Sequence, residues 1–224
     1  LDKNNLFKPS QRVDTLMNLD ESKHGWERFG ENHESKMEGY VEGPWMTKHN
    51  NKYYLQYGAP GTEFNVYADG VYISDSPLGP FKYAPNNPVS YKPGGFVNGA
   101  GHGSTVVGPF DQYWHFATAS ISVVVNWERR LVMYPTGFDK DGLMYCNTSF
   151  GDYPHFGPSV AGKAGQFAGW MLLSYNKPVR TSTHVDSFDA KNIVDEDIRT
   201  FWLAQKNDAQ QWVEIDLQKP AKVY

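Results

Sequence analysis

The stretch MEGYVEGPWMTKHNNKYYLQYG contains two glutamates, Glu38 and Glu42, that lie four positions apart and are each followed by glycine. Only Glu42 is followed by proline and then by a strand-like run, which places its charge at the mouth of a hydrophobic strand. Beside Trp45 and Tyr40 this carboxyl group should be partly desolvated, which favours the protonated form that a general acid requires. The alternative is a solvated glutamate at a strand edge. We assign Glu38 to the surface or to a supporting position.

The residues that follow Glu42 fit a place where a ligand meets a strand. Gly43 would let a ligand approach the backbone closely, because it carries no Cβ. Pro44 cannot donate a ladder hydrogen bond and is typical of the first residue of a strand.

Short strand-like runs must position this carboxyl group. YVEGPWMT, NKYYLQYG and FNVYADGVYISD are separated by polar or Gly/Pro turns, and the same order returns in GHGSTVVG, DQYWHFATA, ISVVVNW and RRLVMYP. This pattern predicts two antiparallel units of three or four strands. Tyr53 and Tyr54 in the first unit correspond to Tyr113 and Trp114 in the second, a spacing typical of long propeller blades. Two blades cannot close a ring, so we expect further sequence upstream.

The composition supports a β protein and excludes several classes of partner. Aromatic residues make up 15% of the 224 residues and charged residues only 21%, which favours strands over a helical bundle. The net charge is −4 and no run of five or more basic residues occurs, so we expect no nucleic acid partner. No apolar run approaches the roughly 18 to 20 residues that span a bilayer, so we expect no membrane partner. The single cysteine, Cys146, is most simply a small core residue.

Three parts are predicted along the chain. Residues 1–160 hold the strand units, although residues 1–35 should form loops and at most one strand. Residues 161–169, AGKAGQFAG, are small and without period and read as a linker. Residues 170–224 have a different residue pattern, with the alternating run WVEIDL, and we interpret them as the opening of a second β domain. Both ends of the sequence look cut, so we expect an interior piece of a longer polypeptide.

The motifs of the first part resemble a known family. YVEGPWMTKHNNKYYLQYG, GVYISDSPLGPF, GHGSTV and RRLVMYPTGFDKDG resemble, in order and spacing, the last two blades of the five-bladed β-propeller of glycoside hydrolase family 43. From about Trp170, NIVDEDIRTFWLA and QQWVEIDL resemble the first third of a discoidin-like (factor 5/8 type C) domain. That domain is a jelly-roll β-sandwich that often binds carbohydrate. The resemblance therefore implies an all-β chain, a partial propeller followed by a partial sandwich.

The family's activity implies a role for Glu42. Its members are inverting glycosidases, and by resemblance Glu42 is the general acid, while the aspartate base and a second, modulating aspartate would lie upstream of this chain. The resemblance implies oligosaccharide or polysaccharide substrates of plant type with arabinofuranosyl, xylosyl or galactosyl ends. It also implies a secreted, periplasmic or cell-surface protein. The alternative function is a glycan-binding propeller that has lost the chemistry.

The resemblance also suggests a metal contact and a sugar contact. His102 in GAGHGSTV matches a histidine that faces the channel and contacts a central cation, commonly calcium, or its water shell; otherwise it is a hydrogen-bonded core residue. Arg129 or Arg130 matches an arginine of the sugar pocket, and the alignment favours Arg129. Either arginine could instead form a salt bridge at a strand edge. His115 is displaced from the Tyr-His pair that many relatives carry.

Several aromatic residues are candidates for stacking on a sugar ring. Trp45, Phe64 and Tyr67 could offer such a face, although most aromatic residues of a propeller pack between blades. In the terminal segment Asp195 should close a turn, and Asp197, Trp202 and Trp212 match discoidin-like positions, with both tryptophans expected in the core.

Overall fold

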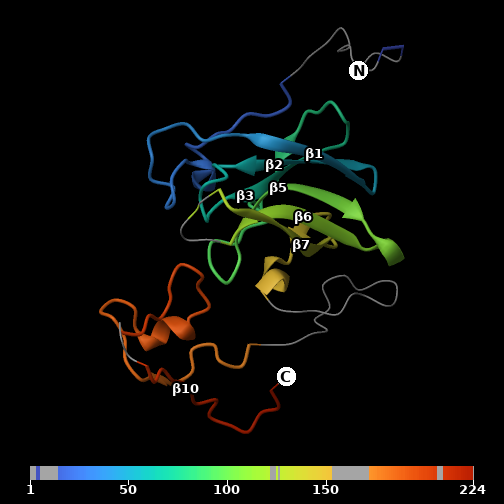
Figure 1. Cartoon of the computed structure of the whole chain (residues 1–224). Coiled ribbons are helices and arrows are strands. Elements are labelled where there is room, and N and C mark those ends of the chain that lie inside the picture. The colour runs from blue at the N-terminus through green and yellow to red at the C-terminus, as the bar shows by residue number, and fades with distance from the viewer. Residues whose placement is uncertain are drawn as a thin grey trace.

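The computed structural model describes residues 4–5, 15–121, 125, 127–152, 172–205 and 209–223, and it is all-β, as predicted (Figure 1). Two four-stranded antiparallel sheets hold their strands in sequence order, β1-β2-β3-β4 and β5-β6-β7-β8. The first sheet consists of β1 (Glu42–His49), β2 (Lys52–Ala59), β3 (Ala68–Ser74) and β4 (Lys82–Tyr83). The second consists of β5 (Asn98–Val107), β6 (Tyr113–Ser120), β7 (Arg129–Phe138) and β8 (Met144–Cys146).

This arrangement confirms the two predicted units and corrects some of their boundaries. Residues 64–67 are not a strand, because the amides of Phe64 and Tyr67 bond to the carbonyls of Gly61 and Phe64 and curl the chain into turns. Of the run 121–127, the described residues 121, 125 and 127 lie in no strand. The short outer strands β4 and β8 were not predicted, since two or three residues carry no visible period.

The two sheets share a core. Met144 of β8 packs with a buried cluster from the first sheet and its following loop, which comprises Tyr54, Val71, Ala84 and Val89. The Tyr54 hydroxyl donates to the carbonyl of Gly142 at 2.7 Å, which ties β2 to the turn before β8. Cys146 packs beside a second cluster, and burial raises the pKa of its thiol to about 12, as fits a core residue.

The segment that precedes β1 is anchored on the first sheet by a buried carboxylate. It contains the 3₁₀ turn η1 (Gly25–Glu27), and its described residues 15–35 form no strand. Glu27 is fully buried, accepts the amide of Asp20 at 2.8 Å and accepts the hydroxyl of Tyr57 at 2.5 Å. These bonds satisfy a charge that burial would otherwise make costly.

The C-terminal part contributes a separate, smaller sheet. It contains β9 (Val179–Thr181), the 3₁₀ turn η4 (Ala190–Ile193) and β10 (Val213–Ile215), and β9 pairs antiparallel with β10. The described residues of this part therefore show one strand pair and no second sheet. The predicted linker, residues 161–169, and the predicted domain start at Trp170 lie outside the described residues. Within the described ranges no helix is long and apolar enough to cross a membrane.

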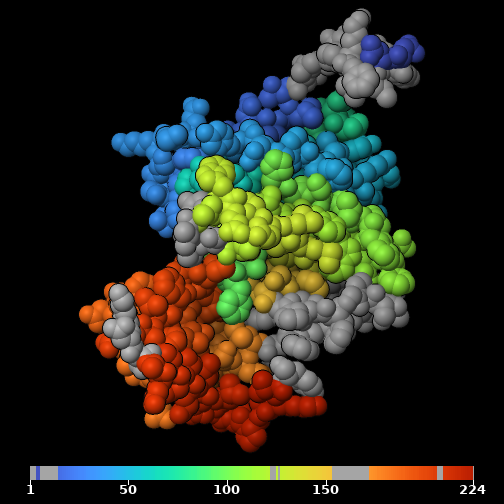
Figure 2. Space-filling model, viewed as in Figure 1, coloured from blue at the N-terminus to red at the C-terminus, as the bar shows by residue number. Residues whose placement is uncertain are grey.

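The C-terminal lobe lies against the second sheet's loops and turns (Figure 2). The amide of Ile198 donates to the carbonyl of Gly95 at 3.1 Å, and Arg199 Nη1 lies 3.8 Å from Glu31 Oε1.

Two short 3₁₀ turns border the strands of the second sheet. The turn η3 (Thr148–Asp152) follows β8, and the turn η2 (Pro109–Asp111) joins β5 to β6.

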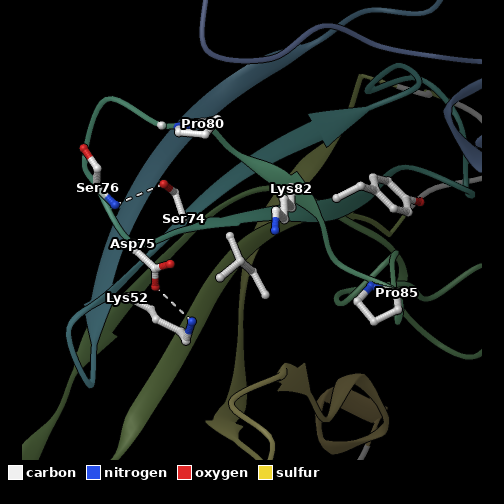
Figure 3. Close-up of a pocket in the computed structure, with 10 residues that line it drawn as sticks. Lys52, Ser74, Asp75, Ser76, Pro80, Lys82 and Pro85 are labelled. Atoms are coloured by element: carbon white, nitrogen blue, oxygen red, sulfur yellow. Dashed lines mark hydrogen bonds and ion pairs between the residues drawn. The ribbon is translucent and has the colours of Figure 1, made fainter.

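An open depression of about 500 Å³ lies on the first sheet (Figure 3). Lys52, Asp75 and Lys82 are among its lining residues, and Lys52 contacts Asp75 at 3.0 Å in an exposed ion pair. Lys52 begins β2, whereas Gly58, which pairs with Glu42, lies near its other end. Lys52 and Gly58 are six positions apart along β2, a distance of roughly 20 Å in an extended strand. The depression therefore lies apart from Glu42.

A buried ion pair provides a test of this packing. Lys92 and Asp152 lie 2.6 Å apart with side chains only 8% and 5% exposed, and Asp152 also accepts the amide of Phe96. In the full-length protein we expect Asp152→Ala to lower the free energy of unfolding by about 3 to 5 kcal/mol, because it leaves the Lys92 ammonium buried and unpaired. Denaturant unfolding measures the loss.

The exposed Lys52–Asp75 pair supplies the matched control. Asp75→Ala removes an ion pair in water and should cost no more than about 1 kcal/mol. Equal losses in the two variants would contradict the buried pair, and Lys92→Met combined with Asp152→Leu should recover most of the loss.

Candidate active site

Glu42 begins β1 at an irregularity that turns its side chain toward the second sheet. It pairs with Gly58, and the register then shifts before Trp45, with Gly43 at φ +58°. The Glu42 side chain is 38% exposed, and its Oε1 accepts the hydroxyl of Tyr67 at 2.7 Å. The carboxyl group is thus held in place on one oxygen and remains accessible from outside.

Tyr67 lies beneath this carboxyl group and is fully buried. Burial and the neighbouring Glu42 raise its pKa far above the usual range, so the phenol keeps its proton and acts as a donor. A Cβ placed on Gly101 would lie 2.7 Å from the Tyr67 ring, so glycine is required at that contact. This burial does not fit the stacking role expected for Tyr67, because a covered ring has no face to offer a sugar.

His102 lies on the other side of Glu42. It belongs to β5, has a positive φ of 55°, and places Nδ1 3.7 Å from Glu42 Oε2 with half of its side chain exposed. A Cβ on Gly43 would lie 2.8 Å from the imidazole. Gly43 therefore serves close packing against His102 in addition to the turn of the backbone.

Arg129 approaches the same place from the start of β7. Its guanidinium carbon lies 5.8 Å from the Tyr67 ring centroid, and Nη1 donates to Thr118 Oγ1 at 3.4 Å. Its Nε and Nη2 are covered and have no hydrogen-bond partner among the described residues. Burial lowers the pKa of Arg129, while Tyr67, Glu63 and Glu42 oppose that shift. Two donor nitrogens of Arg129 therefore stay unpaired within the described part of the chain.

Arg130 forms the salt bridge that was the alternative role for either arginine. Its Nη2 lies 2.7 Å from Glu128 Oε1 on the exposed surface. The structure thus brings Arg129, the residue that the alignment favours, toward Glu42.

The other two aromatic candidates have separate structural contacts. Trp45 donates its indole N–H to the carbonyl of Thr105 at 2.8 Å and keeps 38% of its surface exposed, so it joins β1 to β5 and is only partly covered. Phe64 meets Phe29 edge to face at a centroid distance of 4.7 Å. Stacking of either ring on a sugar stays a prediction.

Sequence reasoning missed two features near this site. Glu63 is close enough to Arg129 to raise its pKa. Asp69 and His115 form a buried pair at 2.8 Å with both side chains 1% exposed, which explains why His115 is absent from the exposed site. Asp69, an aspartate in the middle of the strand-like run FNVYADGVYISD, was the available sign, since a buried charge needs a partner.

The described residues do not form a calcium site on their own. Among them no group of three or more His, Cys, Asp or Glu side chains could hold a metal ion. His102 has one carboxylate neighbour, whereas calcium takes six to eight oxygen ligands. The predicted calcium contact of His102 therefore stays a prediction, and no step below depends on a metal.

Chemically, the cluster combines one accessible carboxyl group with fixed donors. Glu42 can give or take a proton, Tyr67 fixes the direction of its carboxyl group, and Arg129 offers donors that match hydroxyl or carboxylate oxygens. This combination suits proton transfer to a polar ligand with several hydroxyl groups.

Comparison with known proteins finds a family whose model covers most of the two sheets. The model of the family described as glycosyl hydrolases family 43 matches residues 12–144. A beta-D-galactofuranosidase, xynD of Aspergillus niger, is 48% identical over 48 residues, which are 21% of this chain and 14% of that protein.

Solved structures give weaker similarities. An endo-1,4-beta-xylanase from Bacteroides thetaiotaomicron shows 25% identity and a TM-score of 0.46 over 55% of this chain and 40% of that one. A xylan beta-1,4-xylosidase from Bacillus halodurans shows 22% identity and a TM-score of 0.45 over 56% and 26%. The matched part is less than half the length of each of these relatives.

The close packing around His102 can be tested at the next residue. A Cβ on Gly103 would lie 2.2 Å from the His115 ring and 2.4 Å from Asp69 Oδ2, both of them buried. We expect Gly103→Ala to destabilise the full-length protein by about 3 kcal/mol or more, because neither neighbour can move away. Gly94→Ala is the matched control, since nothing lies within 4 Å of its added Cβ. Thermal unfolding compares them, and similar midpoints would refute the packing.

Proposed function

The chain belongs to glycosyl hydrolases family 43, and we propose that Glu42 is the general acid that protonates the leaving oxygen of a glycoside. The observation that carries the proposal is the position of Glu42, which is accessible on one side and held by the buried Tyr67 on the other. A general acid must present its proton in a fixed direction, and a hydrogen bond to one carboxyl oxygen leaves the other oxygen to carry that proton.

Arg129 is the second part of the proposal. Its Nε and Nη2, which have no partner among the residues that the structure describes, lie on a guanidinium that also packs over the Tyr67 ring. A planar fork of donors can bind two neighbouring hydroxyl groups of a sugar, and burial strengthens these bonds. We assign Arg129 to binding of the sugar ring whose bond is cleaved. Trp45, which keeps an exposed face, is the better placed of the aromatic candidates to stack on a sugar.

The reaction also needs a base that this site receives from other parts of the protein. In an inverting glycosidase the base lies about 6.5 to 9.5 Å from the acid, with a water molecule between base and sugar. We propose that upstream blades of the same polypeptide supply an aspartate base. Exposed apolar side chains on the second sheet support this proposal, because another blade would cover them. They include Val106, Leu131 and Met133, which are 37%, 74% and 42% exposed.

We propose terminal or branching furanosyl and xylosyl groups as substrates. The named activity of the Aspergillus niger relative, a galactofuranosidase, adds galactofuranosides to the arabinofuranosides and xylosides of the sequence-based prediction. A panel of aryl glycosides of these three sugars would decide among them.

We propose a discoidin-like, carbohydrate-binding role for the C-terminal part. Asp195 Oδ1 accepts the amide of Asp197 at 3.0 Å and so closes the predicted turn, and the indole of Trp202 donates to Thr183 at 2.8 Å. Asp197 is paired with Arg199 at 2.6 Å, and Trp212 is 49% exposed, contrary to the core position expected for it.

The acid role of Glu42 predicts a specific loss of activity. In the full-length protein, Glu42→Gln should lower kcat/KM for aryl glycosides with poor leaving groups by about 10² to 10⁴-fold, because the amide cannot donate a proton to the leaving oxygen. Glu38→Gln, an exposed glutamate of the same stretch, is the control and should retain activity. Equal turnover of wild type and Glu42→Gln would remove Glu42 from the mechanism. A wild type that binds glycans without cleaving them would favour the lectin alternative.

The hydrogen bond from Tyr67 predicts a loss of rate when it is removed. Tyr67 holds one oxygen of the Glu42 carboxyl group in place, so Tyr67→Phe should lower kcat by about tenfold with little change in KM, because a carboxyl group that is free to rotate presents its proton less often in the productive direction. Tyr54→Phe, which loses a bond to Gly142 instead, is the control and should leave kcat unchanged. Steady-state kinetics compare the two variants, and equal kcat values would contradict the role of Tyr67.

A further inference from the structure

We propose that Asp69, supported by His115, is a positioning residue that holds the His102–Gly103 bulge of β5 against Glu42. The kinetic part of this inference depends on the proposed function, whereas the structural part does not. Asp69 is 1% exposed, so it cannot touch a substrate and can act only through the residues that it contacts.

The inference starts from an irregularity in β5. Gly101 pairs with Thr118 and Ser104 with Phe116, so two residues, His102 and Gly103, lie opposite the single residue Ala117. Such a bulge leaves backbone amides without partners in the ladder. A buried amide without a partner is costly, so another group has to accept from it.

The Asp69 carboxylate is that group. Its Oδ2 accepts the amide of Gly103 at 2.8 Å, and the amide of His102 lies close enough to stabilise the charged carboxylate. Burial raises the pKa of Asp69, while His115 and the two amides act against that shift. A side chain of the first sheet therefore supplies hydrogen bonds that the second sheet lacks.

His115 fixes the carboxylate from behind. Its Nε2 lies 2.8 Å from the same Asp69 Oδ2, and its Nδ1 lies 3.0 Å from Thr105 Oγ1 and 3.2 Å from Gln56 Nε2. Gln56 Oε1 in turn accepts the hydroxyl of Thr47 at 3.1 Å. Because the Gln56 amide faces Nδ1 with its N–H, we assign the imidazole proton to Nε2, which donates to Asp69.

This buried network controls where His102 lies. His102 takes a positive φ within the bulge, packs on Gly43 and reaches 3.7 Å from Glu42 Oε2. Without the Asp69 acceptor nothing in the ladder would hold the Gly103 amide, and the neighbouring His102 imidazole would leave its contact with Gly43. A displacement of about 1 Å at a reacting group can cost about 10²-fold in rate.

Hydrogen exchange followed by mass spectrometry tests the structural part in the full-length protein. Asp69→Leu keeps the approximate shape but removes the acceptors, and it should speed exchange in peptides covering residues 99–105 by at least about tenfold. Asp69→Asn keeps an oxygen at the Oδ2 position and should preserve most of the protection. Exchange across β2 should stay slow in both variants. Unchanged exchange at residues 99–105 in Asp69→Leu would overturn the proposal.

Kinetics on the best aryl glycoside test the functional part. Asp69→Leu should lower kcat by about 10 to 10²-fold relative to wild type and should change the pH profile. The kcat of Asp69→Asn should be at least about tenfold higher than that of Asp69→Leu. Asp152→Ala is the control, because it breaks a buried pair elsewhere and should leave the pH profile and KM of the folded enzyme unchanged. Equal behaviour of Asp69→Leu and Asp152→Ala would reduce Asp69 to a stability role.

The two measurements separate the hypotheses. A wild type without glycosidase activity refutes the proposed function, yet local exchange still decides whether Asp69 holds the bulge. If Asp69→Leu does not fold, Asp69→Ala takes its place, since it also removes the acceptors.

Discussion

The satisfaction of the bulged amides of β5 is the constraint on which the rest of the site depends. A regular edge strand would pair alternate amides with β6 and would leave His102 with no reason to adopt a positive φ. The bulge breaks that pairing, so the missing acceptor comes from Asp69 of the other sheet, at 2.8 Å from the Gly103 amide. The hydrogen bond from Gly103 to Asp69 therefore both connects the two sheets and sets the backbone geometry beside Glu42.

Tyr67 and Asp69 lie two residues apart where β3 begins, and they divide this task. Tyr67 fixes the carboxyl group of Glu42, and Asp69 fixes the backbone of the facing strand. Glycines at 43, 101 and 103 allow these contacts, because an added Cβ would lie 2.8, 2.7 and 2.2 Å from its nearest neighbour. The small residues around His102 thus serve tight packing of protein against protein.

Much of the architecture could be predicted from local pattern. Alternating aromatic and β-branched runs predicted six of the eight strands in the two four-stranded sheets, and they predicted that the strand unit occurs twice. Strand period and turn residues are properties of short segments, so they can be recognised in the sequence. The chemical types of Glu42 and Arg129 were likewise visible in their surroundings. The choice of Arg129 over Arg130 came from the family resemblance, and the structure brings Arg129 toward the site while Arg130 pairs with Glu128.

What could not be predicted depends on contacts between residues far apart in sequence. The pairing of Asp69 with His115 spans 46 positions, and nothing near either residue announces the partner. The sequence makes Tyr67 a candidate for stacking on a sugar, because an aromatic side chain near a glycosidase motif is consistent with both sugar stacking and core packing. Its burial follows from the approach of Gly101, which no local pattern records.

The loop between Lys92 and Asn98 connects three parts of the chain, and this limits how freely the C-terminal part can be exchanged. Lys92 binds Asp152 of η3, its carbonyl accepts the amide of Gly99 at the root of β5, and Gly95 accepts the amide of Ile198. An engineer who replaced residues 172–223 with an unrelated binding module would remove a hydrogen-bond donor from the loop that leads into β5. A chimera of this kind would need a new donor for the carbonyl of Gly95, so the C-terminal part cannot be exchanged without redesigning this contact.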